Sequence, residues 1–338
     1  MAPRLRVAVL AGGRSSEHEI SLASARSVLE SLDPEQYDVV TVAIGRDGRW
    51  ELGTGDGSPS VAETLPVPAE NAPATLGAVD VVLPILHGPF GEDGTVQGLL
   101  ELADVAYVGA GVAASALCMD KDLFKRVLRE SGIRVARSVT LRTGDGIANP
   151  FGFPVFVKPA RLGSSVGITK VRTPDELQPA AELAFRHDEK ILIEESVDGI
   201  EVEVGVLGNR TPPPQASLPG EIVPLGHEWY DYSSKYDEGG MKLVVPPDGL
   251  AEETVARVQD VAVDSFRLTE CEGMARVDCF VTKDGDVLVN ELNTIPGFTA
   301  TSVYAKLFEA SGLSYAEVLD RLIDLAVERH QRRAKLEF

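Results

Sequence analysis

The sequence predicts an α/β protein with two kinds of sheet: an N-terminal parallel α/β domain followed by α+β domains with antiparallel strands. Three observations lead to this prediction. Strand-like and helix-like segments alternate through the first third of the chain, whereas later strands show two-residue alternation with short links. The 338 residues are 44% apolar and 25% charged, which is the composition of a globular protein. A chain of this length has room for about two or three domains.

The first third is expected to form a parallel sheet with helices on both faces, because helix-like segments separate its strands. Ser16 and Glu19 have the spacing of a capping box, which predicts that they open the first helix. Residues 52–78 are rich in Gly, Pro, Ala and Thr and are expected to form a long surface connection. The expected strands are Leu5–Leu10, Asp38–Ile44, Val79–Leu86 and Val105–Val108, and the later helices are Thr95–Ala103 and Ala113–Glu130.

The rest of the chain is expected to form antiparallel sheets. Thr173-Pro174 predicts the start of a helix between two of the strands, and residues 229–241 predict a polar and aromatic loop. A turn at residues 283–286 is expected to join the last two strands, and two helices follow them. The expected strands are Phe153–Lys158, Val166–Val171, Lys190–Glu195, Glu201–Leu207, Met274–Thr282 and Val287–Asn293, with a helix near Glu252–Arg267.

Charge and cysteine content restrict the partners and the compartment. The net charge of −20 repels phosphate backbones and anionic lipids, so nucleic acid and membranes are poor partners. Three cysteines without C-x-x-C spacing argue against a disulfide framework or a structural zinc site, and they fit a cytoplasmic protein. The sequence has neither a signal-peptide pattern nor an apolar run of about 18 residues, so secretion and membrane insertion are not expected.

Two glycine patterns imitate known motifs. Residues 109–114 follow a strand as a dinucleotide fingerprint does, but that fingerprint belongs on the first strand of its domain. Residues 163–167 fit the G-x-S-x-G elbow of serine hydrolases, but the segment after the serine alternates like a strand. We interpret the first as tight strand-to-helix packing. The second is interpreted as a Gly/Ser loop whose N–H and hydroxyl groups can close over phosphates, with a plain hairpin loop as the alternative.

Asp278, Glu291 and Asn293 make the strongest candidate site. Glu291 and Asn293 are two residues apart on one expected strand and share a face, and the turn at 283–286 would bring Asp278 beside them. Two carboxylates and a carboxamide are hard ligands that suit Mg²⁺. Arg276 would share the face of Asp278 and could stabilise charge on a transferring group. The alternative is an exposed polar strand face, but the apolar neighbours indicate burial, and buried acids need partners.

Two lysines are candidates for phosphate binding, because the chain contains no P-loop motif. Lys158 ends an apolar strand just before the Gly/Ser loop, and Lys121 begins a helix. A lysine at the end of a buried strand needs an anion close by. The alternative for Lys158 is an ordinary exposed lysine at the end of a strand.

A further set of short motifs runs in a fixed order along almost the whole chain. They are Gly12-Gly13-x-Ser15-x-Glu17, His87-Gly88 with Gly91-Glu92-Asp93-Gly94, Met119-Asp120-Lys121, Val157-Lys158-Pro159, Gly163-Ser164-Ser165-Val166-Gly167, Tyr230-Asp231-Tyr232, Lys235-Tyr236, Arg276-x-Asp278 and Glu291-x-Asn293-Thr294-x-Pro296-Gly297-Phe298-Thr299. In this order and spacing the chain resembles the D-alanine–D-alanine ligase family. Its members are ATP-grasp enzymes that make the dipeptide terminus of peptidoglycan precursors, and so serve cell wall synthesis and cell shape.

The resemblance implies three domains, with ATP held between the last two. They are an N-terminal α/β substrate-binding domain (residues 1–117), a central ATP-grasp domain (118–193) and a C-terminal ATP-grasp catalytic domain (194–338). The resemblance also implies ATP contacts from Lys121, Lys158, Ser164, Ser165, Glu194 (adenine amino group) and Glu201 (ribose). It places two Mg²⁺ ions on Asp278, Glu291 and Asn293, with Mn²⁺ as a substitute. K⁺ is a further candidate cofactor, for which no site is assigned. The chain departs from the family at Glu195, where lysine is common, so Glu195 is left unassigned.

The implied reaction joins two D-alanine molecules through a D-alanyl phosphate. By resemblance, Glu17 and His87 lie at the first D-alanine, Lys235 and Ser302 hold the carboxylate of the second, and Arg276 and Gly297 stabilise the oxyanion. Glu17, Ser164 and Tyr236 would latch a lid formed by residues 163–167 and 229–241. Tyrosine at 236 is associated in the family with dipeptide rather than D-lactate products. The resemblance further implies a cytoplasmic homodimer.

Three other functions stay open at this point. The first is a D-alanine–D-lactate ligase, and the second is an ATP-grasp ligase for other substrates. The third is a silent nucleotide-binding regulator, which would require the loss of a metal ligand, of Arg276 or of a phosphate-binding lysine. None of these residues is missing.

Overall fold

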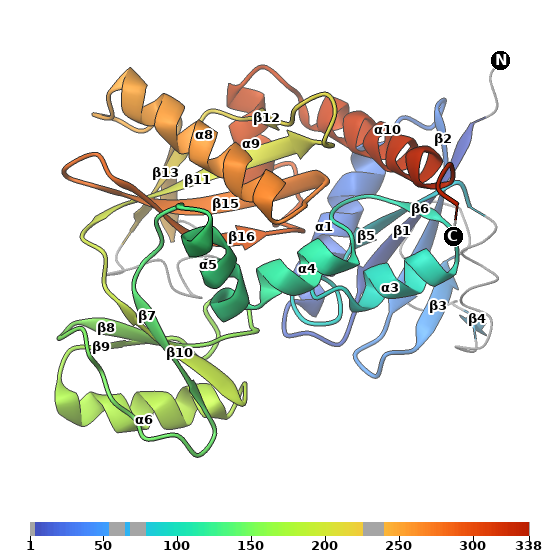
Figure 1. Cartoon of the computed structure of the whole chain (residues 1–338). Coiled ribbons are helices and arrows are strands. Elements are labelled where there is room, and N and C mark those ends of the chain that lie inside the picture. Colours follow the sequence, from blue (N-terminus) through green and yellow to red (C-terminus); the bar gives the residue numbers. More distant parts are fainter. Residues whose placement is uncertain (1–3, 54–64, 68–78, 226–239, 338) are drawn as a thin grey trace.

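The N-terminal sheet has a core of parallel strands and two short antiparallel strands at one edge. The computed structural model describes residues 4–53, 65–67, 79–225 and 240–337 (Figure 1). The sheet order is β4-β3-β2-β1-β5-β6, and β2, β1, β5 and β6 run parallel, as predicted. Their bounds are β1 Leu5–Gly12, β2 Tyr37–Ile44, β5 Val81–Ile85 and β6 Ala106–Tyr107. The antiparallel strands β3 (Trp50–Gly53) and β4 (Leu65–Val67) lie partly within the segment expected to be a connection.

Helices cover both faces of this sheet, because alternate residues of β1 point to opposite sides. Val7 and Val9 pack in one core with α1 (His18–Ser31) and with α10 (Tyr315–Arg333), the last helix of the chain. Ala8 and Leu10 pack on the other face with α3 (Thr95–Leu102). Figure 1 shows α10 lying along the N-terminal sheet, so the C-terminal end of the chain helps to build the first domain. No helix of the described residues is both long and apolar enough to cross a bilayer.

The first helix starts later than predicted. Helix α1 begins at His18, and Glu17 occupies the cap position without a side-chain cap bond, so the predicted capping box of Ser16 and Glu19 is wrong. The Ser15 hydroxyl does the local bonding instead. It accepts from the Glu17 N–H at 3.2 Å and donates to the His87 carbonyl at 2.7 Å. The turn is thus fixed by a contact with a distant loop, which local spacing does not reveal.

The helix expected over Ala113–Glu130 is two helices. Helix α4 (Val112–Met119) ends at Asp120, whose extended backbone (ψ 95°) separates it from α5 (Lys121–Glu130). The Asp120 carboxylate accepts from the Leu123 N–H at 3.1 Å and so caps α5. This break places Lys121 in the first turn of a new helix.

The central sheet is antiparallel, as predicted, with order β7-β10-β8-β9. Its strands are β7 (Ser138–Arg142), β8 (Val155–Pro159), β9 (Thr169–Val171) and β10 (Lys190–Glu195), and α6 (Pro174–Phe185) packs on it. Strand β7 was not predicted, and β9 starts later than Val166 because the preceding loop has left-handed residues. Strand β10 continues past residue 193, so the predicted boundary between the second and third domains falls inside a strand.

The C-terminal sheet is also antiparallel, with order β14-β13-β11-β15-β16 and β12 paired to β11. Its strands are β11 (Gly199–Gly208), β12 (Gln215–Ala216), β13 (Gly220–Pro224), β14 (Met241–Val244), β15 (Gly273–Thr282) and β16 (Val287–Asn293). The predicted turn joins β15 and β16 through the Thr282 N–H, which donates to the Asp286 carbonyl at 3.0 Å. Helices α8 (Glu252–Leu268) and α9 (Val303–Ala310) complete this part.

Candidate active site

Two cavities meet beside the glycine-rich loop. The first, which we call the intersheet cavity, measures about 360 Å³ and is lined by residues of the central and C-terminal sheets. The second, the interdomain cavity, measures about 380 Å³ and is lined by α1, the loop after β5 and the ends of β15 and β16. Gly163, Ser164 and Glu291 line both cavities. A group bound in one cavity can therefore approach a group bound in the other at these three residues.

The intersheet cavity is lined by both charged and apolar side chains. Phe156, Ile200, Ile222 and Phe280 contribute apolar wall. The six residues predicted to contact ATP all line this cavity: Lys121, Lys158, Ser164, Ser165, Glu194 and Glu201. An apolar cavity with a few converging polar groups suits a flat base joined to a charged chain.

A buried carboxylate lies between two lysines at this cavity. Glu194 is 2% exposed, and its two oxygens lie 2.5 Å from the Lys158 Nζ and 2.8 Å from the Lys125 Nζ. Burial raises the pKa of Glu194, but the two lysines outweigh it and hold the pKa below its ordinary value. Burial lowers the pKa of Lys125 despite Glu194. Sequence reasoning missed Lys125, although it lies one helical turn after Lys121 and on the same side of α5.

Lys121 points to the junction of the two cavities. Its ammonium donates to the Leu162 carbonyl at 2.8 Å and lies 3.4 Å from Glu291 Oε2. Glu195, which was left unassigned, is bound by Arg137, whose Nε donates to it at 2.7 Å. The glutamate at position 195, where the family often has lysine, is therefore paired with Arg137, which directly precedes β7.

The loop at 163–167 crosses to the N-terminal domain. Ser164 and Ser165 have φ of +53° and +57°, a left-handed backbone that few residues other than glycine adopt. The Ser164 hydroxyl donates to a Glu17 oxygen. Gly167 has φ +72°, and a Cβ there would lie 2.7 Å from the His187 ring. This contact across domains is more than a plain hairpin loop would make.

Glu17 is buried in the wall of the interdomain cavity, between two glycines. A Cβ at Gly88 would lie 2.6 Å from Glu17 Oε2, and one at Gly163 would lie 3.6 Å from it. Small residues on both sides let the carboxylate reach the cavity. A buried carboxylate in this position is suited to bind an ammonium group.

His87 lies behind this carboxylate and is 4% exposed. Its Nδ1 lies 3.0 Å from the Ile295 carbonyl and its Nε2 lies 3.3 Å from the Ser24 hydroxyl. Burial lowers the pKa of His87, so the neutral ring is favoured. A neutral ring donates to the carbonyl from Nδ1 and accepts the hydroxyl proton at Nε2. Glu92, which sequence reasoning did not assign, lines the same cavity, and burial followed by the charge of Glu17 raises its pKa.

Arg276 lies between two buried acids. Its guanidinium donates to both oxygens of Asp278, at 2.7 Å each, and its Nε lies 3.0 Å from Glu203 Oε2. Glu203 was not predicted. It follows Glu201 by two residues on β11 and stands opposite Asp278 in the ladder, so strand pairing would have indicated it.

The predicted metal ligands come together as expected from the strand pairing. Asp278 pairs with Glu291 across β15 and β16, and the Asn293 amide donates to Asp278 at 3.0 Å. Among the described residues, no group of three or more His, Cys, Asp or Glu side chains could hold a metal ion. The candidate set includes only two such side chains and adds a carboxamide. Its oxygens are nevertheless the ligand type that Mg²⁺ takes, so these residues fit the ion.

The start of helix α9, in the C-terminal part of the chain, lies at the interdomain cavity. Ser302 occupies the cap position of α9, and its hydroxyl accepts from the Thr299 N–H at 2.9 Å. Gly297 and Ser302 both line the cavity. The first N–H groups of a helix and its dipole favour an anion such as a carboxylate.

Two family models match the chain. The model described as "D-ala D-ala ligase N-terminus" matches residues 6–110, and the model described as "D-ala D-ala ligase C-terminus" matches residues 127–324. The chain belongs to the D-alanine–D-alanine ligase family. Among curated relatives, "D-alanine--D-alanine ligase A" of Mesorhizobium japonicum is 46% identical, over 98% of this chain and 100% of the relative.

Solved structures of this family share the whole fold. The VanG D-Ala:D-Ser ligase from Enterococcus faecalis has a TM-score of 0.85 at 36% identity, covering 96% of this chain and 100% of that one. The D-alanine–D-alanine ligase from Bacillus anthracis complexed with ATP has a TM-score of 0.79 at 27% identity, covering 97% and 99%. The ATP-grasp architecture predicted from the sequence is thereby confirmed.

Some predicted ligase residues lie outside the described part of the chain. Lys235, Tyr236 and most of the predicted lid at 229–241 fall within residues 226–239. Met241 is described and lines the interdomain cavity. The roles predicted for Lys235 and Tyr236 remain predictions.

The two glycine patterns that imitate other motifs have structural explanations. A Cβ at Gly273 would lie 3.0 Å from the Gly109 N, so residues 109–114 pack tightly against another segment. Arg329 of α10 donates to the carbonyls of Tyr107 (2.7 Å) and Gly109. No helix follows Ser165 before β9, so the geometry of a nucleophile elbow does not form there.

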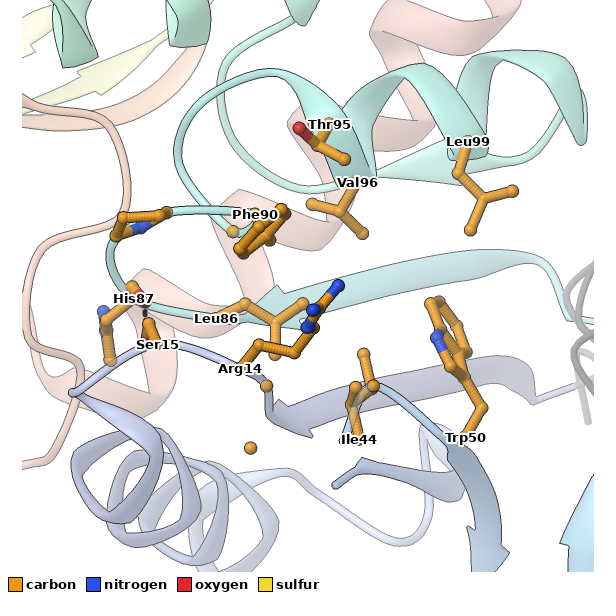
Figure 2. Close-up of a pocket in the computed structure, with 15 residues that line it drawn as sticks. Arg14, Ser15, Ile44, Trp50, Leu86, His87, Phe90, Thr95, Val96 and Leu99 are labelled. Carbon is orange, nitrogen blue, oxygen red and sulfur yellow. Dashed lines mark hydrogen bonds between the residues drawn. The ribbon is translucent and has the colours of Figure 1, made fainter. Parts of the chain in front are cut away.

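A third cavity, of about 220 Å³, lies at the ends of β1, β2 and β5 beside α3 (Figure 2). The Arg14 guanidinium lies 5.1 Å from the Phe90 ring there. Most of its lining is apolar, including Ile44, Trp50, Leu86, Val96 and Leu99. Phosphates need more donors than this cavity offers, so we do not assign a nucleotide to it. Ser15 and His87 form part of its wall, so it backs onto the loops of the interdomain cavity.

Proposed function

We propose that this protein ligates two D-alanine molecules to D-alanyl-D-alanine at the expense of ATP, for peptidoglycan precursor synthesis. The observation that carries the proposal is the meeting of two cavities at Gly163, Ser164 and Glu291. A triphosphate chain in the intersheet cavity and a carboxylate in the interdomain cavity would come together at this point. The charged groups needed to bind each of them are present on the matching side.

The first step forms an acyl phosphate. A carboxylate oxygen of the first D-alanine attacks the γ-phosphorus of ATP, the new O–P bond forms, and the bond to the β-phosphate oxygen breaks to release ADP. Such a transfer depends on positioning and on neutralising charge. Lys121 and Lys158 supply positive charge at the intersheet cavity, while Glu17 would hold the ammonium group of the amino acid.

The second step joins the amine to the activated carbon. The amine of the second D-alanine attacks the acyl carbon, a tetrahedral oxyanion forms, and phosphate leaves with the oxygen that came from the first carboxylate. Arg276 and the Gly297 N–H would stabilise the oxyanion. Ser302 and the start of α9 would hold the second carboxylate, with Lys235. An acyl phosphate reacts with water, and the hydrogen bond between Ser164 and Glu17 would help to keep the loop closed over the junction.

Asp278, Glu291 and Asn293 would hold the Mg²⁺ ions, two by resemblance to the family, with Mn²⁺ as a substitute. K⁺ is a further candidate cofactor without an assigned site. When bound, such ions neutralise charge on the phosphates. Arg276 already offsets the charge of Asp278. Glu291, which lines both cavities, is the ligand best placed to connect the metal to the reacting groups.

The amino acid that acts as the nucleophile in the second step has a specific alternative to D-alanine. The structural relative VanG is a D-Ala:D-Ser ligase and matches this chain at 36% identity. D-Serine is therefore a second candidate for the second site. Tyr236 supports an amine over the hydroxyl of D-lactate, by resemblance to the family.

We further propose a cytoplasmic homodimer, with neither nucleic acid nor membrane as partner. Large apolar side chains remain exposed on and beside α3, with Phe90 47%, Leu102 89% and Val112 40% exposed. Exposed apolar side chains that lie in a subunit interface would be covered by contact with a second copy of the protein. The net charge of −20 argues against anionic partners.

The test measures phosphate and dipeptide together. The purified protein is given Mg-ATP and D-alanine, with D-serine, D-lactate or L-alanine offered in parallel. We expect one phosphate and one ADP for each D-alanyl-D-alanine, with little product from the other three. Phosphate release that depends on another acceptor but not on D-alanine would overturn the proposal.

A further inference from the structure

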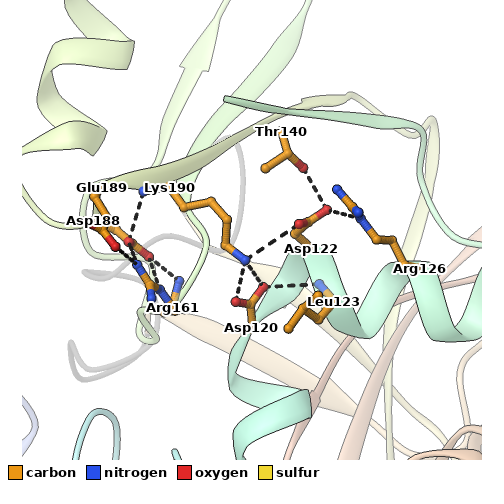
Figure 3. A network of polar contacts seen from close by, with 9 residues as sticks. All are labelled: Asp120, Asp122, Leu123, Arg126, Thr140, Arg161, Asp188, Glu189 and Lys190. Carbon is orange, nitrogen blue, oxygen red and sulfur yellow. Dashed lines mark hydrogen bonds and ion pairs between the residues drawn. The ribbon is translucent and has the colours of Figure 1, made fainter. Parts of the chain in front are cut away.

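A lysine that no catalytic role accounts for is buried where β10 begins. Lys190 is 3% exposed, and its ammonium donates to both oxygens of Asp120, to Oδ1 at 2.6 Å (Figure 3). Asp122 Oδ2 lies 3.6 Å from the same ammonium. Asp122 also accepts from Thr140 and from Arg126, at 2.8 Å each, so Asp120 is the acid that depends most on Lys190.

Asp120 is the residue that separates α4 from α5. Its carboxylate binds the Lys190 ammonium and caps α5 at the Leu123 N–H. Lys121 follows it directly and points its ammonium to the Leu162 carbonyl. The direction of the Lys121 side chain at the start of α5 is therefore set by Asp120, which Lys190 holds in place.

Backbone hydrogen bonds through Ala160 also connect Lys190 to Lys121. The Ala160 N–H donates to the Lys190 carbonyl, and the Lys121 N–H donates to the Ala160 carbonyl, both at 3.0 Å. Arg161 is held by Asp188, whose carboxylate accepts from the Arg161 N–H at 2.8 Å and from the Lys190 N–H at 3.0 Å. The segment that enters the glycine-rich loop is thus fixed to Lys190 by side chains and backbone.

We propose that Lys190 is a positioning residue, which through Asp120 sets Lys121 and the entry to the loop at 163–167 for phosphoryl transfer. The inference rests on the proposed function. Neither Lys190 nor Asp120 lines the intersheet cavity or the interdomain cavity. Their effect on the reaction would pass through Lys121, which lines the intersheet cavity, and through the loop that lines both.

A role in stability alone is the competing explanation, and it predicts a different pattern. Removing one partner of a buried ion pair leaves an unpaired charge and destabilises a fold, whereas removing both partners is often nearly neutral. The double variant Asp120→Asn with Lys190→Met therefore separates the two roles. Asparagine still caps a helix, so α5 keeps its start.

The experiment compares this double variant, Lys190→Met and Lys190→Arg with the unmodified protein. Lys283→Met is the matched control, because Lys283 pairs with Asp198 at 2.8 Å and both side chains are exposed. Thermal unfolding, the affinity for a non-hydrolysable ATP analogue by calorimetry, the KM for ATP and the phosphate released per dipeptide are measured for each.

We expect the double variant to unfold at nearly the same temperature as the unmodified protein. It should nevertheless bind the ATP analogue about tenfold more weakly and release more than one phosphate per dipeptide. Lys190→Arg should restore part of the nucleotide affinity and of the coupling between phosphate and dipeptide, and Lys283→Met should change neither quantity. A folded double variant with unchanged nucleotide affinity and one phosphate per dipeptide would overturn the inference. Absence of dipeptide from the unmodified protein would instead reject the proposed function, while the nucleotide affinities would still test Lys190.

Discussion

Glu291 is the residue at the junction of the two cavities whose replacement should affect the proposed reaction most clearly. It lines both cavities, pairs with Asp278 across the ladder and lies 3.4 Å from the Lys121 ammonium. Its side chain is 21% exposed, so its removal leaves no large cavity in a core.

Glu291→Ala should therefore lower kcat by about 100-fold or more, since it removes a proposed metal ligand and a partner of Lys121. The thermal unfolding midpoint should stay within about 4 °C of the unmodified protein. Glu253→Ala, at an exposed position on α8, is the control for loss of one carboxylate. Near-normal turnover of Glu291→Ala in Mg²⁺ would refute the assignment.

Glu194 gives the protein a specific dependence on pH. Its folded pKa is held low because Lys125 and Lys158 outweigh the effect of burial. The stability it contributes is present above the unfolded pKa of about 4.3 and is lost as the pH falls through the folded value. Glu194→Gln should lower the free energy of unfolding by about 3 kcal/mol at pH 7 and by less at pH 3. Equal losses at both pH values, measured by denaturant unfolding without nucleotide, would contradict this.

At the scale of elements, the glycine-bearing loops matter because they bring backbone close to Glu17. Gly88→Ala would add a Cβ 2.6 Å from Glu17 Oε2 at a position with φ +73°. Gly132→Ala is a matched control, because Gly132 has φ +83° but no atom within 4 Å of its added Cβ. Both variants should lose about 1 kcal/mol of stability from left-handed strain.

Only Gly88→Ala should also raise the KM for the first D-alanine, while the KM for ATP changes little. The measurement is a pair of initial-rate series, one varying D-alanine and one varying ATP. An equal effect of the two substitutions on the KM for D-alanine would mean that the distance to Glu17 is unimportant.

The elements that sequence predicted well are those with a strong local pattern. Strands β1, β10, β15 and β16 have apolar runs or alternation, and the turn at 283–286 has the residues that turns favour. The errors arose where a tertiary contact decides the local structure. The start of α1 depends on Ser15 binding the His87 carbonyl, and the break at Asp120 is held by Lys190. Neither partner is near in sequence.

At the scale of the whole molecule, the site exists only because three sheets meet. The intersheet cavity needs the central and C-terminal sheets, and the interdomain cavity needs α1 and the loop after β5. Sequence motifs identified several residues that line these cavities, including Glu17 and Arg276. They did not identify Lys125 or Glu203, since both are recognised only by the buried acid or cation beside them. Charge pairing across elements is not visible from spacing along one element.

The path of one oxygen atom shows directly whether the substrate carboxylate reacts with ATP. If the two cavities bring a D-alanine carboxylate to the γ-phosphorus of ATP, the phosphate that leaves must contain one oxygen from that carboxylate. D-Alanine labelled with ¹⁸O in its carboxylate is incubated with Mg-ATP and the protein, and the released phosphate is analysed by mass spectrometry. We expect one ¹⁸O in each phosphate released with a dipeptide. Unlabelled phosphate alongside a normal yield of dipeptide would contradict it.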